Sequence, residues 1–305
     1  MEKHAKTAVP ICALSALLWR STALLSIALV ASGCSLLLRS TGATAPTPPP
    51  QAAAAGFTKL TFSDEFNSIS TIDVNATGLP GYKWYVDRPF GWPVVQRSEY
   101  RICNGVLVIT QQGSSYANWG SATYSVKGKT GRAFRYGYIE ARMRFDPALG
   151  PNSDGWPSFW MLSLSHTLGS NDSRYSELDI FEAYTGGYAE YKRAFVGTLH
   201  EWQQKPTLVH YQNANNWTPL PHVDFGKWHT YGVLWKPGEV TWYFDGTALQ
   251  TQRYSANGYP EPQTNPISPI GTFSIIDSED LVLILGSGVS WPLYVDYVRV
   301  WQKDR

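Results

Sequence analysis

From residue 57 onward, hydrophobic and polar positions alternate in short runs that turn residues separate. In Ile139–Phe145, polar and apolar side chains alternate as they do in a strand with one buried face. No long stretch shows the apolar period of about 3.6 residues that is typical of a helix. The clearest strand-like runs are Phe57–Phe62, Val106–Gln111, Tyr138–Phe145, Ser158–Leu164, Glu177–Ala183, Phe195–His200, His229–Trp235, Val240–Phe244, Leu281–Gly286 and Tyr294–Trp301. Runs at this spacing predict an all-β domain, built as a two-sheet β-sandwich.

A strong turn signal follows the run that ends at Phe244. Asp245 and Gly246 both tolerate the positive φ that a tight hairpin turn requires. We therefore predict a hairpin whose second strand is Thr247–Gln252. The composition agrees with strands joined by tight turns, because 26 Gly and 20 Pro accompany an aromatic content of 14%.

The first residues of the chain differ in composition from the rest. Lys3, Lys6 and Arg20 precede an apolar run that ends in Ala31-Ser32-Gly33-Cys34. This pattern predicts an export signal over residues 1–34, and the small residues before Cys34 resemble a bacterial lipoprotein signal. The alternative is an ordinary secretory leader that is cleaved elsewhere.

The segment 35–56 is rich in Pro and Ala, which predicts an extended tether. One folded domain is then expected over residues 57–305, a length that an all-β sandwich can reach as a single domain. We expect an exported protein that a lipid on Cys34 anchors to a membrane, with a secreted or periplasmic protein as the alternative.

Cysteine and charge counts exclude several classes of protein. Only Cys12, Cys34 and Cys103 occur, so the chain has no disulfide framework. Cys103 lies in an apolar stretch without a partner motif, which predicts a small buried side chain. The formal net charge is +1 and basic runs are missing, which argues against nucleic acid as a partner.

Three carboxylates, Glu177, Asp179 and Glu182, fall within one strand-like run. In a regular strand Glu177 and Asp179 would share a face and Glu182 would point to the other. A β-bulge at Ile180 or Phe181 would return Glu182 to the first face, with roughly 5 to 6 Å between the two Glu carboxyl groups. That separation suits a retaining glycosidase. A solvated acidic strand face or a metal site would give the same bare pattern.

The surrounding motifs decide between these interpretations. They are Ser63–Phe66, Tyr136–Arg142, Asp154–Leu162, Gly197–His200, Trp228–Tyr231 and Val295–Val300. In content and order they resemble glycoside hydrolase family 16, from about Phe57 to Trp301. The resemblance implies a concanavalin A-like β-jelly-roll with a cleft on its concave face, and a retaining mechanism.

Carried onto this chain, the resemblance implies that Glu177 is the nucleophile, Glu182 the acid/base and Asp179 the carboxylate that assists them. The spacing is that of the bulged, laminarinase-like branch of the family. Residues 172–176 and 183–186, on either side of the carboxylates, depart from the laminarinase pattern. The resemblance implies an endo-type hydrolase of β-linked polysaccharide. Because the departures bear on the substrate, the polymer stays open, with β-1,3- or mixed-linkage glucan as the leading substrates.

Further sites follow from the same resemblance. Trp156 and Trp160 share one face of a strand, where indole rings could stack on sugars, and His200 matches a histidine near the cleft. Core packing is the alternative for all three, and Trp202 and Tyr184 are weaker candidates for the same role. Glu65, Gly105 and Asp296 match the ligands of a structural calcium ion, an oxygen-only set that suits a hard cation. The alternative is plain hydrogen bonding without an ion, and the chemistry itself requires no cofactor.

Two other functions remain open from the sequence. A transglycosylase on the same fold shares the first half-reaction and differs only in whether water or a sugar intercepts the intermediate. A non-catalytic carbohydrate-binding sandwich is the second, although such a module has no use for two acids at this spacing. In each case the expected partner is a polysaccharide, and the protein is expected to be a monomer.

Overall fold

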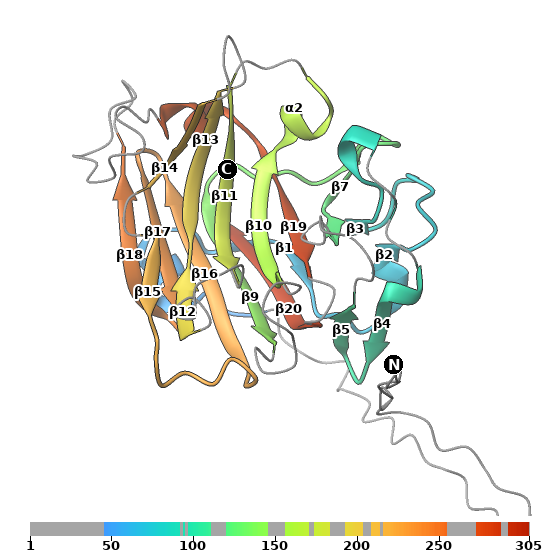
Figure 1. The fold of residues 1–305 in the computed structure, drawn as a ribbon, viewed down its shortest axis with the longest axis horizontal. Helices are drawn as coiled ribbons and strands as arrows, with labels where there is room; N and C mark the ends of the chain where they lie inside the picture. Colours follow the sequence, from blue (N-terminus) through green and yellow to red (C-terminus); the bar gives the residue numbers. More distant parts are fainter. Residues whose placement is uncertain are drawn as a thin grey trace, which may run out of the picture. The chain divides into compact units, whose positions relative to one another are not determined.

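Two sheets, antiparallel except for one short pair at the edge of the second sheet, lie face to face and enclose the core (Figure 1). The computed structural model describes residues 46–91, 94, 97–110, 120–145, 156–170, 174–183, 193–203, 209–213, 216–254, 273–287 and 292–304. All of these residues belong to the unit Ala45–Arg305. The predicted all-β sandwich is confirmed.

The first sheet has the strand order β18-β17-β16-β9-β20-β5-β4, and β1 also pairs with β20. Its strands are β1 (Lys59–Asp64), β4 (Tyr100–Cys103), β5 (Val106–Ile109), β9 (Gly137–Arg144), β16 (His229–Lys236), β17 (Glu239–Phe244), β18 (Thr247–Arg253) and β20 (Leu293–Gln302). The predicted hairpin is confirmed, since β17 pairs with β18 across Asp245 and Gly246, whose φ values are 47° and 76°.

The second sheet has the strand order β14-β13-β11-β10-β19-β6-β3-β2. Its strands are β2 (Ile72–Asp73), β3 (Trp84–Tyr85), β6 (Ser121–Ala122), β10 (Ser158–Ser163), β11 (Arg174–Glu182), β13 (Thr198–Gln203), β14 (Val209–Gln212) and β19 (Leu281–Gly286). Two smaller pairs are β7 (Tyr124–Ser125) with β8 (Thr130–Gly131), and β12 (Ala194–Val196) with β15 (Trp217–Pro219).

One predicted strand is divided in the structure. The run Phe195–His200 forms the end of β12 and the start of β13, which belong to different sheets. Gly197 lies between them, against the indole ring of Trp242, where a Cβ would stand only 2.4 Å from a ring carbon. The chain can pass this close to the ring only without a side chain, so the division falls at the glycine.

The core forms where the alternating apolar positions of the two sheets meet. From the second sheet, Phe159 and Met161 of β10 are fully buried; from the first sheet, Val233 and Trp235 of β16 meet them in the same cluster. Each large apolar side chain buried in this way contributes about 1.5 to 3 kcal/mol. The other face of the second sheet carries a smaller apolar cluster that includes Trp160.

Helices are short in the described part of the chain. The α-helices are α1 (Pro50–Ala54) and α2 (Leu164–Thr167), and the 3-10 helices are η1 (Ile69–Thr71), η2 (Pro89–Gly91), η3 (Arg97–Glu99) and η5 (Phe273–Ser278). None of the helices that the structure describes is long and apolar enough to cross a membrane.

The tether was predicted over residues 35–56, and its last residues are not extended in the structure. Pro50–Ala54 form α1, in which Ala52 is fully buried against an apolar cluster that contains Tyr138 and Trp301. Gln51 donates a hydrogen bond to the Tyr138 hydroxyl at 2.7 Å. Pro at the first helical position and the following alanines favour a helix over an extended chain, so these residues belong to the folded domain. Residues 35–45 lie outside the described residues.

Cys103 was expected to be buried, and the structure shows it exposed. It is the last residue of β4, where inward and outward side chains alternate, and Tyr100 is the buried residue of that strand. Asn104 and Gly105 then turn the chain into β5. The alternation therefore places the thiol outside, although the surrounding sequence is apolar.

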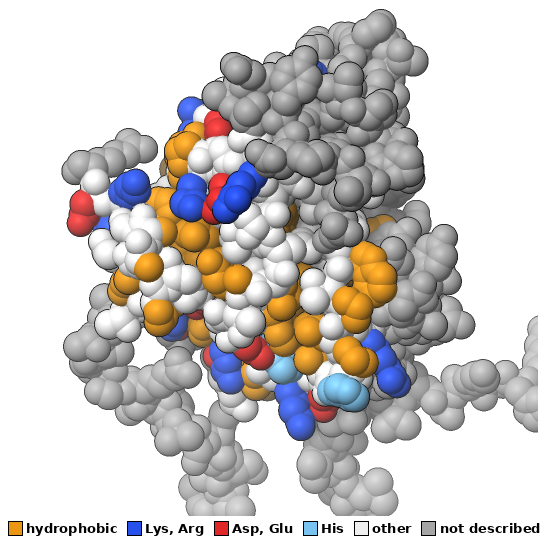
Figure 2. All heavy atoms as spheres, turned by 90° about the vertical axis from the view of Figure 1, so that its left-hand side faces the viewer, with side chains coloured by type: hydrophobic (Ala, Val, Ile, Leu, Met, Phe, Trp, Pro, Cys, Tyr) orange, Lys and Arg blue, Asp and Glu red, His pale blue; other side chains and the backbone are white. Residues whose placement is uncertain are grey.

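Charged side chains are interspersed on the side of the molecule that lies at the left of Figure 1, near β18. Figure 2 shows blue and red side chains lying beside one another among white and orange ones, within the described residues of this view. On β17, Glu239 illustrates such pairing, because Lys236 lies 2.8 Å and Arg253 2.9 Å from its two oxygens. These opposite charges largely neutralise one another.

Candidate active site

A β-bulge in β11 interrupts the pairing of this strand with β10. Phe181 lies opposite Phe159 and Asp179 lies opposite Trp160, which leaves Ile180 without a partner residue. The bulge that was predicted at Ile180 or Phe181 is thus confirmed at Ile180. Both Ile180 and Phe181 belong to the main core.

The bulge determines which way the acids point. Because two consecutive residues, Ile180 and Phe181, are committed to the core, the alternation of the strand shifts by one residue after them. Glu182 therefore lies on the same face as Glu177 and Asp179, the face opposite the core. We call this side of the second sheet the carboxylate face.

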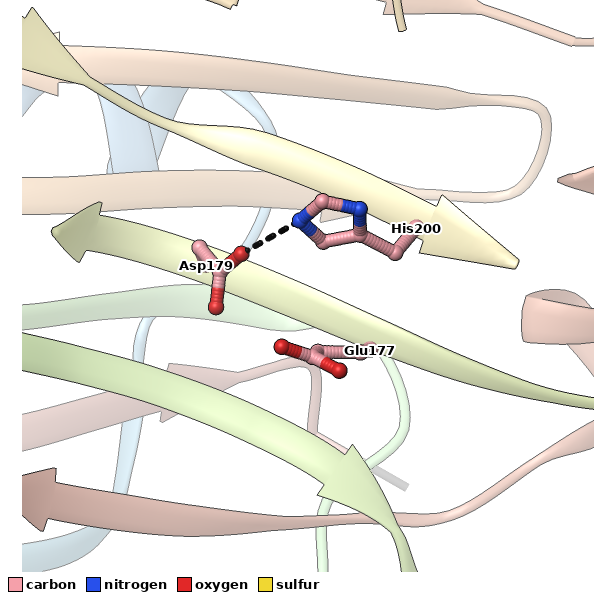
Figure 3. Close-up of side chains that lie close together, drawn as sticks. All are labelled: Glu177, Asp179 and His200. Carbon is pink, nitrogen blue, oxygen red and sulfur yellow. Dashed lines mark ion pairs between the residues drawn. The ribbon is translucent and has the colours of Figure 1, made fainter. Parts of the chain in front are cut away.

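Asp179 is held by a histidine from the neighbouring strand. Its Oδ2 lies 2.8 Å from Nε2 of His200 on β13, and Figure 3 shows the imidazole ring directed at the carboxylate. In the pairing of β11 with β13, His200 stands directly opposite Glu177. The structure thus brings His200 together with two of the acids, as expected from the sequence.

Glu177 is partly exposed and accepts a hydrogen bond from the indole of Trp202. The distance from Nε1 of Trp202 to Oε2 of Glu177 is 2.9 Å. Burial raises the pKa of Glu177, and the negative charge of Glu182 adds to that rise, whereas the charge of His200 and the Trp202 hydrogen bond oppose it. Both opposing contacts favour the ionised form of Glu177.

Glu182 lies in a different environment. Burial and then the negative charge of Asp179 raise its pKa well above the usual range, and Trp156 Nε1 donates to its Oε1 at 3.0 Å. Burial and then the negative charge of Glu177 also raise the pKa of Asp179 well above its usual range. The hydrogen bond that the two acids share lowers the pKa of Asp179 and raises that of Glu182, so it favours the proton on Glu182.

The predicted sugar-binding residues divide into two kinds. Trp156 contacts Glu182 directly and so lies at the site, whereas Trp160 is only 6% exposed and packs in the apolar cluster of the carboxylate face. Stacking of a sugar on Trp160 stays a prediction. Tyr184, a weaker candidate from the sequence, lies outside the described residues.

Two further residues contribute to the site: Trp202, which was only a weak candidate from the sequence, and His210, which was not predicted. Trp202 follows His200 by two residues on β13, so the strand alternation could have placed it on the same face. His210 comes from β14, and its Nε2 lies 2.6 Å from Nδ1 of His200. No motif marks His210, since its place depends on how a separate edge strand pairs with β13.

Two groups of residues are candidates for metal binding. Glu177, Asp179 and His200 offer ligand atoms within 4.8 Å of one another and could hold a divalent cation at the carboxylate face. The expected calcium ligands lie elsewhere: both oxygens of Glu65 pair with Arg299 at 2.8 Å.

Asp296, the other carboxylate of the expected calcium set, pairs with Arg142 at 2.6 Å. Two guanidinium groups thus already occupy the carboxylates that the ion would need, and their positive charge would repel it. Glu65 and Asp296 are thus held by arginines in this structure, and calcium binding by Glu65, Gly105 and Asp296 stays a prediction from the family resemblance alone.

A groove of about 1090 Å³ lies at another part of the fold. Phe57, Arg132, Tyr136, Lys236 and Lys303 are among its lining residues. It shares no residue with the carboxylate face and takes no part in the candidate site. The predicted export signal, with Cys34, lies outside the described residues.

Comparisons with known proteins place the fold and the site in context. A beta-glucanase from Rhodothermus marinus is 26% identical over 323 residues, covering 96% of this chain and 98% of that protein. The Endo-1,3-1,4-beta-glycanase EglC of Rhizobium meliloti is 28% identical over 218 residues, or 62% of this chain. That match spans only 41% of the length of EglC.

Among solved structures, an endo-1,3-beta-glucanase from Streptomyces sioyaensis has the same fold. Its TM-score is 0.54 at 20% identity, with 86% of this chain and 100% of that chain covered. The β-jelly-roll expected from the sequence is thereby confirmed. Residues 98–272, more than half of the chain, match the family described as Glycosyl hydrolases family 16. The chain belongs to this family.

Proposed function

We propose that this protein is an endo-acting glycoside hydrolase that cleaves β-1,3- or mixed-linkage glucan by double displacement. The observation that carries the proposal is the contrast between the two glutamates. Glu182 shares a proton with Asp179, while Glu177 accepts an N–H from Trp202. One acid is thus prepared to donate a proton and the other to act as an anion, which is the division of labour that a glycosidase requires. The names of the two relatives agree with a glucan as the substrate.

In the first step, the Glu177 carboxylate attacks the anomeric carbon of the bound sugar. The bond from that carbon to the glycosidic oxygen breaks, and Glu182 gives its proton to the departing oxygen. The product is a glycosyl ester on Glu177, while Glu182 is left as a carboxylate. Loss of its proton is assisted because His200 already lies beside Asp179, where its positive charge stabilises the new anion.

In the second step, Glu182 accepts a proton from water, and the oxygen of that water attacks the anomeric carbon. The ester bond to Glu177 breaks, which restores the nucleophile and the protonated acid. Two inversions at one carbon leave the configuration of the sugar unchanged. Asp179 takes part by its negative charge and its hydrogen bond, which raise the pKa of Glu182 and so favour the protonated acid at the start of each cycle.

A panel of laminarin, mixed-linkage glucan, agarose and carrageenan tests the substrate class. We expect a ladder of oligosaccharides from the first two polymers, and initial products in the β configuration when they are followed by proton NMR. Glu177→Gln serves as the control, because the amide preserves the shape of the site but cannot attack the sugar. Products longer than the substrate chain would show transglycosylation instead, and release of single sugars alone would contradict endo cleavage.

For the beginning of the chain, we propose that Cys34 carries a lipid that anchors the exported protein to a membrane. The proposal is supported by the apolar run and small residues before Cys34. Cys34→Ser should move the protein from the membrane fraction to the soluble exported fraction. Incorporation of a labelled fatty acid that the substitution leaves unchanged would contradict the anchor.

A further inference from the structure

One side chain on the edge strand β14 contacts both residues that support the catalytic acids. His210 stands directly opposite Trp202 in the pairing of β13 with β14, and the two rings stack at 3.7 Å with 5° between their planes. His200 is its diagonal neighbour, since His200 pairs with Gln212. The Nε2 atom of His210 lies 2.6 Å from Nδ1 of His200.

Each of these two neighbours binds a different acid. His200 reaches Asp179 through its other ring nitrogen at 2.8 Å, and Trp202 reaches Glu177 through its indole N–H at 2.9 Å. His210 is therefore separated from two of the three acids by a single residue in each case. It is partly buried.

We propose that His210 is a positioning residue that fixes His200 by a hydrogen bond and Trp202 by ring stacking, and thereby sets the orientation of Asp179 and Glu177. Only the expected effect of His210 on the rate of hydrolysis rests on the proposed function. The hydrogen bond and the stacked pair exist in the protein without substrate.

The protonation of His210 agrees with this role. Burial, followed by the positive charge of His200, lowers the pKa of His210 to about 4. Near neutral pH His210 is therefore uncharged, and its Nε2 can accept a hydrogen bond from Nδ1–H of His200. The other ring nitrogen of His200, Nε2, lies 2.8 Å from Oδ2 of Asp179. The other ionisable groups of the described site, Glu177 and Glu182, lie beyond these contacts on β11.

Two substitutions separate the two contacts. His210→Phe keeps a ring that can stack on Trp202 but has no atom that accepts a hydrogen bond from His200. His210→Gln keeps an oxygen that can accept this bond but loses the ring. His222→Phe is the matched control, because His222 is exposed on a turn outside the site.

We expect each His210 variant to lower kcat by about tenfold, the order of loss that follows from a small misplacement of catalytic groups. KM should stay within about twofold, since His210 orients the acids and does not bind the sugar. His210→Phe should also move the pH profile of kcat/KM, because it disturbs His200 beside Asp179. Each variant is first checked for an unchanged fold by circular dichroism and thermal unfolding.

Parent-like kcat in either variant overturns the proposal, because one of the two contacts is then without effect. A rise in KM at unchanged kcat overturns it as well, since His210 would then be a substrate contact. The control His222→Phe should match the parent in every measurement.

A measurement without substrate makes failure of this inference distinguishable from failure of the proposed function. Nitrogen NMR of the labelled histidine rings near neutral pH should show a proton on Nδ1 of His200 and none on Nε2 of His210. The His200 signals should shift in His210→Phe and not in His222→Phe. A proton on Nε2 of His210 overturns the inference. If the signals are as expected but the parent cleaves no polysaccharide, the proposed function fails and the hydrogen bond stands.

Discussion

Two tryptophans offer a way to tell the nucleophile from the acid/base without removing either glutamate. Trp202 donates to Glu177 at 2.9 Å, and Trp156 donates to Glu182 at 3.0 Å. Replacing each with phenylalanine deletes the indole N–H and keeps an aromatic ring. In either variant, the glutamate loses a hydrogen bond that favours its ionised form, so its pKa should rise.

The two increases in pKa should appear on opposite limbs of the pH profile of kcat/KM. The nucleophile must be ionised, so a higher pKa of Glu177 moves the acid limb of kcat/KM to higher pH in Trp202→Phe. The acid must be protonated, so a higher pKa of Glu182 moves the alkaline limb to higher pH in Trp156→Phe. A hydrogen bond to a charged group is worth about 1.5 to 3 kcal/mol. Because both glutamates are partly exposed, we use the lower end, which corresponds to about one pH unit.

The assay is kcat/KM on a soluble glucan, measured across the pH range over which the parent is stable. Trp217→Phe is the matched control, since Trp217 is 37% exposed on β15, and its profile should equal that of the parent. If the alkaline limb moves in Trp202→Phe and the acid limb moves in Trp156→Phe, the two roles are reversed. Unchanged profiles in both variants would refute the link between these hydrogen bonds and catalysis.

Three further predictions test the site and the fold. In Glu182→Ala, azide should rescue turnover of an activated β-linked substrate and give a β-glycosyl azide, detected by NMR, whereas Glu177→Ala with azide should give the α product. Asp179→Asn removes the negative charge that raises the pKa of Glu182, so the alkaline limb of kcat/KM should move to lower pH. An unmoved limb would count against the effect of Asp179 on Glu182. In Gly232→Ala, the new Cβ would lie 2.5 Å from the hydroxyl of buried Tyr138. The free energy of unfolding, measured in urea, should fall by about 1 to 3 kcal/mol. An unchanged midpoint would mean that Tyr138 moves aside freely.

The strands and the bulge could be predicted because local sequence determines them. Alternation over Ile139–Phe145 suffices to place β9, since each side chain is directed by its neighbours in the same strand. The spacing of Glu177 and Glu182 predicts a bulge for the same reason, because no regular strand could bring both acids to one face. The pairing of Phe159 with Phe181 and of Trp160 with Asp179 then fixes it at Ile180.

What the sequence could not supply depends on contacts between distant segments. His210 enters the site only because β14 pairs with β13 in a register that places it opposite Trp202, and a shift by one residue would turn it to the other face. Helix α1 was interpreted as tether because the prolines that precede it favour an extended chain and its five residues are too few to predict a helix on their own. Its docking requires the Tyr138 hydroxyl and the apolar surface around Trp301, which become visible only in the folded sheet.

The bulge also links the stability of the core to the chemistry of the carboxylate face. Ile180 and Phe181 are 0% and 1% exposed, and burial of such side chains contributes about 1.5 to 3 kcal/mol each. A regular strand would have to expose one of them and bury Glu182 in the apolar core instead, where an unpaired carboxylate is costly. Packing therefore favours the one backbone arrangement that places Glu182 beside Asp179. The raised pKa of Glu182 follows from that neighbour and from its own burial, so the same apolar contacts that hold the two sheets together also prepare the acid for catalysis.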